Sequence, residues 1–191
     1  MTRPGGRSAR VRDAVHDAVV ELLAAGEIDA AIPKIAERAG VNPTSIYRRW
    51  GNRDNLLLDA AVTRLRSTSP IPDTGSLRGD LTGWADGVES AMRDRHGQIL
   101  LRALVATMAP EREPVEYLQA RGEDLQRTLD AAAARGEAVP EVQDLLDHVL
   151  APLYLRVLFR LPVEPGVGAQ LVERLLKGLR ADPAPRAGRG G

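Results

Sequence analysis

Apolar residues recur every three to four positions along most of this 191-residue chain. That spacing puts side chains on one face of an α-helix. The first such stripe, expected to start at a Ser8 cap and to stop near Gly26, is formed by Val11, Val15, Ala18, Val19 and Leu22. No segment alternates strictly between apolar and polar residues over the length of a strand. The pattern predicts an all-α protein with about nine helices.

The next helices are short and separated by residues that favour turns. We expect helices over residues 32–39 and 43–50, with Gly40 in the break between them. Asn52 is a plausible cap for a fourth helix, because asparagine side chains accept hydrogen bonds from exposed N–H groups at helix starts. Residues 67–76 contain two prolines and several turn formers, and they predict a connector.

Five further helices are expected, around residues 77–91, 99–108, 118–132, 142–158 and 171–179. The stretch 99–108 is apolar on nearly every side, which predicts a helix buried all round. Pro152 interrupts the long helix 142–158. A proline lacks the N–H that would bond to the carbonyl four residues earlier, so His148 loses a partner and we expect a kink.

Composition narrows the class of protein. The chain has no cysteine, which excludes disulfides and thiolate chemistry and is compatible with a cytoplasmic location. It has no apolar run of membrane-spanning length and no apolar signal core near its start. Residues 1–70 carry 11 basic and 8 acidic side chains, against 15 and 18 in residues 71–191. Residues 1–7 are interpreted either as a basic, disordered arm that tracks phosphates or as a solubilising tail.

The segment 32–50 meets the needs of a helix-turn-helix. Ala36 is small enough to let two helices cross closely, and Gly40 tolerates the positive φ of the turn. Ile46 and Trp50 lie four residues apart and can pin the second helix to the rest of the module. Asn42 followed by Pro43 is a typical helix start.

The exposed side of the second helix carries the groups that read DNA. In this motif the N-terminal part of the second helix meets base edges in the major groove, where hydroxyls and guanidinium groups form hydrogen bonds. We interpret Arg48 as a base contact, and Tyr47, Arg49 and Arg53 as phosphate contacts. Surface arginines are more often only solvated. The full predicted set is Lys34, Asn42, Pro43, Thr44, Ser45, Tyr47, Arg48, Arg49 and Arg53.

The sequence IAERAGVNPTSIYRRW followed by GNRDNLLLDAAV resembles the DNA-binding domain of the tetracycline-repressor (TetR) family. The resemblance covers residues 8–66 strongly, and beyond them only helix count, chain length and the last two helices, which form the dimer in the family. The chain departs from the family at two places. Ala30 and Ala31 stand where the family often has a Thr or Ser before its second helix. Arg53 replaces the usual lysine at the start of the fourth helix.

The resemblance implies a DNA-binding domain over residues 8–66 and a ligand-binding and dimerisation domain over 77–180. The turn-forming residues between them predict the connector over 67–76, and the composition of residues 181–191 predicts a disordered tail. The resemblance also implies a homodimer with an inducer pocket. Ordinary core packing is the alternative for each residue of both sets. The predicted pocket comprises Trp84, Val88, Met92, Leu101, Leu104, Val105, Met108, Tyr117, Leu125 and Tyr154. The predicted dimer face comprises Leu145, Leu153, Val157, Leu171, Leu175 and Leu179.

The expected function is a ligand-responsive repressor that binds a near-palindromic operator in double-stranded DNA. The few aromatic residues favour an aliphatic cavity, and so a hydrophobic or amphiphilic inducer. A regulator of the same fold without a small ligand, whose C-terminal domain serves dimerisation or a protein partner, is the alternative. We expect no cofactor and no metal, because the three histidines lie far apart in sequence. The sequence shows no polar cluster or phosphate-binding loop of an enzyme.

Overall fold

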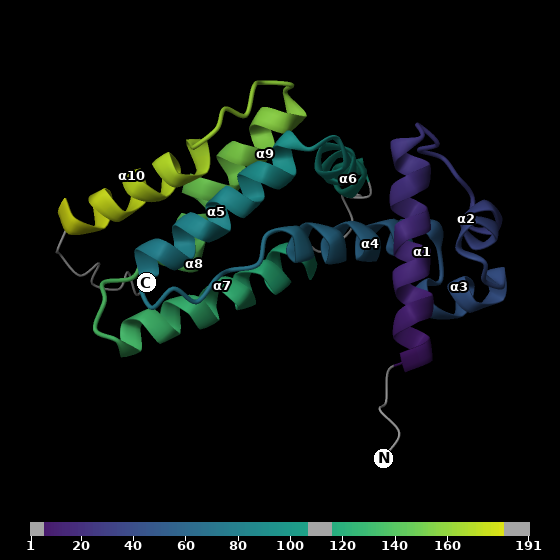
Figure 1. Cartoon of the computed structure of the whole chain (residues 1–191), viewed down its shortest axis with the longest axis horizontal. Coiled ribbons are helices and arrows are strands. Elements are labelled where there is room, and N and C mark those ends of the chain that lie inside the picture. The colour runs from purple at the N-terminus through teal and green to yellow at the C-terminus, as the bar shows by residue number, and fades with distance from the viewer. Residues whose placement is uncertain (1–5, 107–115, 182–191) are drawn as a thin grey trace, which may run out of the picture. The chain divides into compact units, whose positions relative to one another are not determined.

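The computed structural model describes residues 6–106 and 116–181, and within them it contains helices and no strand. The helical segments α8, η1 and α9 follow one another without a break, so the described residues form nine helical elements (Figure 1). This confirms the predicted fold class. Across these residues, no helix combines the length and the apolar character needed to cross a membrane.

The chain forms two compact units, each described here by itself. The first comprises residues 6–68 and 91–106. Its helices are α1 (Gly6–Ala24), α2 (Ile32–Ala39), α3 (Pro43–Trp50), α4 (Arg53–Thr68) and α6 (Arg95–Ala106). Helix α1 packs against α2, α4 and α6, and α2 packs against α3. The predicted cap at Ser8 is wrong, because α1 starts two residues earlier at Gly6.

The predicted turn chemistry of this unit is confirmed. Gly26 and Gly40 have φ values of 86° and 66°, a left-handed conformation that costs glycine least. The side chain of Asn42 accepts a hydrogen bond from the Thr44 N–H at 2.8 Å, and Asn52 accepts one from the Asn55 N–H at 2.9 Å. These contacts satisfy donors at the starts of α3 and α4 that have no partner within their helices.

Helix α6 corrects the prediction of a helix buried on all sides. Its buried face consists of Gly97, Leu100, Leu101 and Leu104, and it packs on α1 and α4. Val105 remains 39% exposed, and Arg102 is exposed as well. The apolar residues of α6 therefore extend beyond the face that α1 and α4 cover. Gly97 is required where α6 begins, because a Cβ there would overlap the backbone of Ala91.

The second unit comprises residues 69–90 and 116–181. It holds most of α5 (Leu77–Arg93), with α7 (Glu116–Ala134), α8 (Val142–Leu145), the π-helical segment η1 (Leu146–Leu150), α9 (Ala151–Leu158) and α10 (Val167–Ala181). The π-helical turn lies directly before Pro152, where the Ala151 N–H bonds to the Leu146 carbonyl five residues back. The missing N–H of Pro152 thus widens one turn of a continuous helix.

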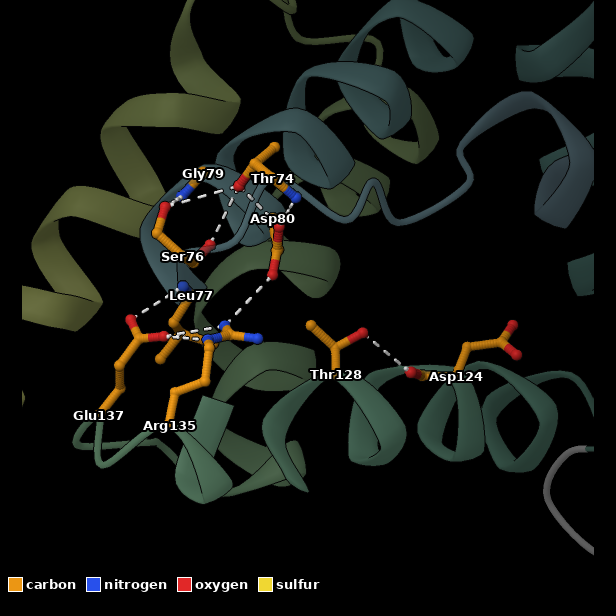
Figure 2. Close-up of polar contacts among 9 residues, drawn as sticks. All are labelled: Thr74, Ser76, Leu77, Gly79, Asp80, Asp124, Thr128, Arg135 and Glu137. Atoms are coloured by element: carbon orange, nitrogen blue, oxygen red, sulfur yellow. Dashed lines mark hydrogen bonds and ion pairs between the residues drawn. The ribbon is translucent and has the colours of Figure 1, made fainter. Parts of the chain in front are cut away.

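A polar cluster fastens the connector to both α5 and the end of α7 (Figure 2). The buried carboxylate of Asp80 accepts hydrogen bonds from the Thr74 N–H at 2.6 Å and the Thr74 hydroxyl at 2.7 Å. Arg135 pairs with Asp80 at 3.6 Å and with Glu137 at 2.8 Å. Glu137 also accepts the Leu77 N–H at 2.9 Å, and this bond together with Arg135 holds the pKa of Glu137 below its ordinary value.

Helix α10 is anchored to α5 by another buried carboxylate. The two oxygens of Glu89 accept the N–H groups of Gly166 at 3.0 Å and Gly168 at 2.9 Å, at the start of α10. A negative charge is favourable there because the helix dipole is positive at its N-terminus. The helices approach closely, since a Cβ on Gly168 would lie 2.7 Å from the carbonyl oxygen of Ala85.

Candidate nucleic-acid interface

Helix α3 presents a polar face made of residues predicted from the sequence. Thr44 and Arg48 are exposed, Tyr47 is 49% exposed, and Ser45 is half-buried. Arg48 makes no hydrogen bond or ion pair with any other residue that the structure describes. This face offers hydroxyl donors and acceptors near the start of the helix and a guanidinium group one turn later. These groups are complementary to base edges and phosphates.

The opposite face of α3 is buried, as the sequence predicted. Ile46 is 0% exposed and Trp50 is 7% exposed, and Ala36 of α2 is fully buried. The small side chain of Ala36 is consistent with the close packing of α2 and α3. Because one side of α3 is committed to the core, its polar side is held outward.

Arg49 has partners within the protein. Its guanidinium donates to the Ser8 hydroxyl at 3.0 Å and lies 5.4 Å from the centre of the Trp50 ring, a cation–π geometry. These contacts link the end of α3 to the start of α1. Arg49 remains exposed, so its predicted phosphate contact stays a prediction.

Arg53 and Lys34 also contact other residues of the protein. Arg53 donates to the carbonyl oxygens of Ala30, at 3.0 Å, and Ile28, and thereby holds the segment between α1 and α2. Lys34 pairs with Glu27. Ala31 occupies the cap position of α2, and it supplies no side-chain hydrogen bond to the start of that helix. Two residues of the predicted DNA-binding set therefore also stabilise the segment before α2.

Asp59 of α4 is a residue that the sequence analysis missed. Its Oδ2 accepts the Trp50 indole N–H at 2.7 Å and lies 3.0 Å from Nε2 of His16 in α1. The hydrogen bond with His16, followed by that from Trp50, holds the pKa of Asp59 below its ordinary 3.8 against the opposing effect of burial. Separations of 9 and 43 residues carry no helical periodicity, so no sequence pattern indicated this contact.

The predicted pocket residues fall in both units. In the second unit, Trp84, Val88 and Leu125 are buried and Tyr154 is partly exposed. In the first unit, Met92, Leu101 and Leu104 are buried, whereas Val105 is exposed. Met108 and the side chain of Tyr117 lie outside the described residues. The pocket as one set stays a prediction.

The six residues of the predicted dimer face fall into two groups that differ in burial. Leu145, Leu153 and Val157 are at most 3% exposed, so they belong to the core of the second unit and have almost no surface to offer another chain. Leu171, Leu175 and Leu179 are partly exposed along α10. Three apolar side chains that do not belong to the predicted dimer face are exposed at the end of α9, namely Leu155, Phe159 and Leu161.

Across the described residues, no group of three or more His, Cys, Asp or Glu side chains is arranged to hold a metal ion. The polar clusters that do occur, around Asp59, Asp80 and Glu89, join helices to one another.

Comparison with known proteins identifies two matching families. Residues 16–60 match bacterial regulatory proteins of the tetR family, and residues 71–175 match the tetracyclin repressor-like C-terminal domain. The chain is 32% identical to the HTH-type transcriptional repressor Rv3405c of Mycobacterium tuberculosis, an alignment that covers 78% of this chain and 72% of that protein.

A stronger but shorter similarity is to the HTH-type transcriptional regulator AqdR of Rhodococcus erythropolis, 37% identical over 55% of this chain. That alignment spans 52% of AqdR's own length. A crystal structure of a TetR family regulator from Marinobacter aquaeolei has the same fold, with a TM-score of 0.55, 20% identity and coverage of 92% of this chain and 96% of that one. The matched families and these relatives are regulators of transcription and not enzymes. The chain belongs to the TetR family of helix-turn-helix transcriptional regulators.

Proposed function

We propose that this regulator is a repressor that binds a near-palindromic operator in double-stranded DNA as a homodimer. The observation that carries the proposal is the outward polar face of α3, where Thr44, Tyr47 and Arg48 are exposed while Ile46 and Trp50 fix the other side. Arg48 is the base-reading group, because a guanidinium can bond to both acceptors of guanine in the major groove. We infer a cytoplasmic location, because a regulator of this kind acts on DNA.

A homodimer is supported by the apolar surface of the second unit. Leu155 is 49% exposed, Phe159 72% and Leu161 54%, and the partly exposed leucines of α10 add to them. Exposed apolar residues of this size commonly mark protein interfaces. A two-fold dimer presents two copies of α3 to half-sites that lie one helical turn of DNA (about 34 Å) or a multiple of it apart, and the operator must then be nearly palindromic.

The proposed inducer is a small hydrophobic or amphiphilic molecule that binds the C-terminal domain. Trp84 supports a ligand, because its indole N–H is buried and meets no hydrogen-bond acceptor in the described part of the chain. A ligand oxygen would satisfy that donor. The inducer releases DNA if it binds more tightly to a dimer shape whose α3 helices no longer match the half-sites. Repression, rather than activation, is supported by the repressor named among the relatives.

A regulator of this fold without a small ligand is the second candidate. The observation that favours it is the packing of the second unit, in which Trp84, Val88 and Leu125 are at most 2% exposed. In that case the C-terminal domain would serve only dimerisation or a protein partner.

The test is binding of the purified protein to DNA from its own promoter region, with footprinting and a salt titration. We expect a protected near-palindrome and an affinity that falls steeply with salt, because phosphate contacts release counterions. Transcription in vitro from that promoter should fall as protein is added. A protein that binds this DNA only weakly and without sequence preference would contradict the proposal, and a rise in transcription would make it an activator.

The ligand is tested on the same protein–DNA complex. A set of hydrophobic and amphiphilic compounds is screened for those that raise the melting temperature of the free protein and release the operator. A compound that does both supports the inducer, and its effect should weaken in Trp84→Phe. A screen in which no compound does either favours the second candidate.

A further inference from the structure

The end of α3 is attached to two other helices through a single carboxylate oxygen. Oδ2 of Asp59, on α4, accepts the indole N–H of Trp50 at 2.7 Å and lies 3.0 Å from Nε2 of His16 on α1. The rings of His16 and Trp50 pack beside each other, with centroids 5.9 Å apart and planes inclined by 49°. Three helices of the first unit therefore meet at Asp59.

The rings of His16 and Trp50 are buried, and this makes their contacts with Asp59 important for the stability of the junction. His16 and Trp50 are each 7% exposed, whereas the side chain of Asp59 is 40% exposed. A buried donor that loses its acceptor carries an uncompensated desolvation cost, so both rings depend on the carboxylate. Asp59 is ionised at neutral pH, because these hydrogen bonds hold its pKa below 3.8. Hydrogen bonds to a charged acceptor are stronger and shorter than those between neutral groups.

The contact with Asp59 also bears on the orientation of α3. Trp50 is the last residue of α3, and the DNA-facing residues Tyr47 and Arg48 lie within one turn of it. Apolar packing of Ile46 and Trp50 holds α3 against the unit but is not directional. A hydrogen bond has a preferred donor angle, so the bond to Asp59 restricts the rotation of α3 about its own axis. A small rotation would displace every side chain on the polar face together.

We propose that Asp59 is a positioning residue that sets the orientation of α3 on the operator, acting through Trp50 and His16 and without contact to DNA. The inference rests on the proposed function, because it requires operator binding by α3. It differs from a general stabilising role in that it ties one carboxylate to sequence discrimination.

The test compares Asp59→Asn with the wild type, using the operator defined by footprinting and an unrelated duplex of equal length. Loss of the charged acceptor should lower operator affinity by about tenfold, whereas affinity for the unrelated duplex should change by less than about twofold. Asp17→Asn is the matched control, because Asp17 is an exposed acid of α1 outside the junction. It removes the same charge from the same module and should leave both affinities close to those of the wild type.

A spectroscopic readout reports the contact itself. The chain has two tryptophans, so its ¹H–¹⁵N spectrum contains two indole resonances, which Trp84→Phe assigns. The Trp50 resonance should shift in Asp59→Asn and stay in place in Asp17→Asn. Trp50→Phe provides a second variant, because it removes the indole donor, retains an aromatic ring and should reproduce the loss of operator preference. It also keeps the proposal testable if Asp59→Asn does not fold.

Two results would overturn the inference alone. One is an operator affinity that stays at the wild-type value in both folded variants, and the other is an equal loss of affinity for both duplexes. A wild-type protein that does not prefer any promoter sequence would overturn the proposed function and this inference with it. The two failures are therefore distinguishable from the wild-type measurement.

Discussion

At the scale of single residues, two neighbouring arginines on α3 have different surroundings. Arg48 projects from the exposed face without a partner among the described residues, whereas Arg49 donates to Ser8 and covers the ring of Trp50. We expect Arg48→Ala to lose about 1–3 kcal/mol of operator binding and to relax sequence preference at one base pair. Competition binding with single-base operator variants measures both effects.

Arg49→Ala should instead weaken folding. If the contacts with Ser8 and Trp50 are its whole role, the salt dependence of binding should stay nearly unchanged, contrary to the predicted phosphate contact. Removal of a phosphate-contacting cation lowers the slope of log affinity against log salt by about 1, whereas removal of an internal brace does not. Ser8→Ala is the control, because it removes the acceptor without changing the charge and should share part of the stability loss. A slope reduced by about 1 in Arg49→Ala would show that Arg49 binds phosphate.

The ionisation of Asp59 predicts an acid-dependent loss of stability. Its pKa in the folded protein lies below the ordinary 3.8, chiefly because of the hydrogen bond with His16. A carboxyl group with a lowered folded pKa stabilises the protein above its unfolded pKa, and the contribution disappears as the pH falls through the folded value. Urea unfolding followed from pH 6 downward should therefore show a steeper decline below about pH 4 for the wild type than for Asp59→Asn. Parallel declines in the two proteins would be evidence against a lowered pKa.

At the scale of elements, two glycines of α10 should respond oppositely to alanine. A Cβ on Gly168 would lie 2.7 Å from the carbonyl oxygen of Ala85, whereas a Cβ on Gly178 would meet no atom within 4 Å. We expect Gly168→Ala to cost on the order of 1–3 kcal/mol, because the backbone of α5 has to move. Gly178→Ala should gain up to about 1 kcal/mol, since alanine is the better helix former.

Chemical denaturation of the two variants tests this contrast within one helix. Gly178→Ala serves as the internal control for the effect of alanine on helix propensity. If Gly168→Ala proved as stable as Gly178→Ala, the close approach of α10 to α5 would be incorrect.

The elements themselves were largely predictable because they depend on local chemistry. The bounds of α2 and α3 follow from Gly40, Asn42 and Pro43, whose conformational preferences act within a few residues. The π-helical turn was predictable only in part. Pro152 indicates that one backbone hydrogen bond of the helix is lost. The sequence does not show which helical turn widens, because that depends on how Leu145 and Val149 pack inside the second unit.

Contacts between elements were much less predictable. Asp59, Asp80 and Glu89 each look like an ordinary acid of a predicted helix, because no spacing rule in the sequence pairs them with a residue of another helix. Only the folded structure shows that each joins its helix to others. Similarly, α9 carries apolar residues on two sides, because Leu153 is fully buried whereas Leu155, two residues later, is 49% exposed. Helical spacing identifies apolar residues, but it does not tell a protomer's core from an interface when both are apolar.

At the scale of the whole molecule, the exposed apolar residues at the end of α9 are a surface through which a dimer would form. Phe159 is 72% exposed and lies four residues after Leu155, so the two share one face at the end of α9. If that face pairs with a second copy, burying Phe159 contributes about 1.5–3 kcal/mol to association. Phe159→Asp should then raise the dimer dissociation constant by about 10- to 100-fold or more. Analytical ultracentrifugation over a concentration series measures that constant directly.

Ile28→Asp is the matched control, because Ile28 is 61% exposed but lies in the first unit. It introduces the same charge at a similar apolar site and should leave association unchanged.

Operator binding should weaken in Phe159→Asp in proportion to the loss of dimer, because a single α3 reads only one half-site. High protein concentration should restore that binding, which separates a dimerisation defect from a DNA-contact defect such as that expected for Arg48→Ala. If Phe159→Asp remained a dimer while Leu175→Asp dissociated, the interface would run along α10 and exclude the end of α9.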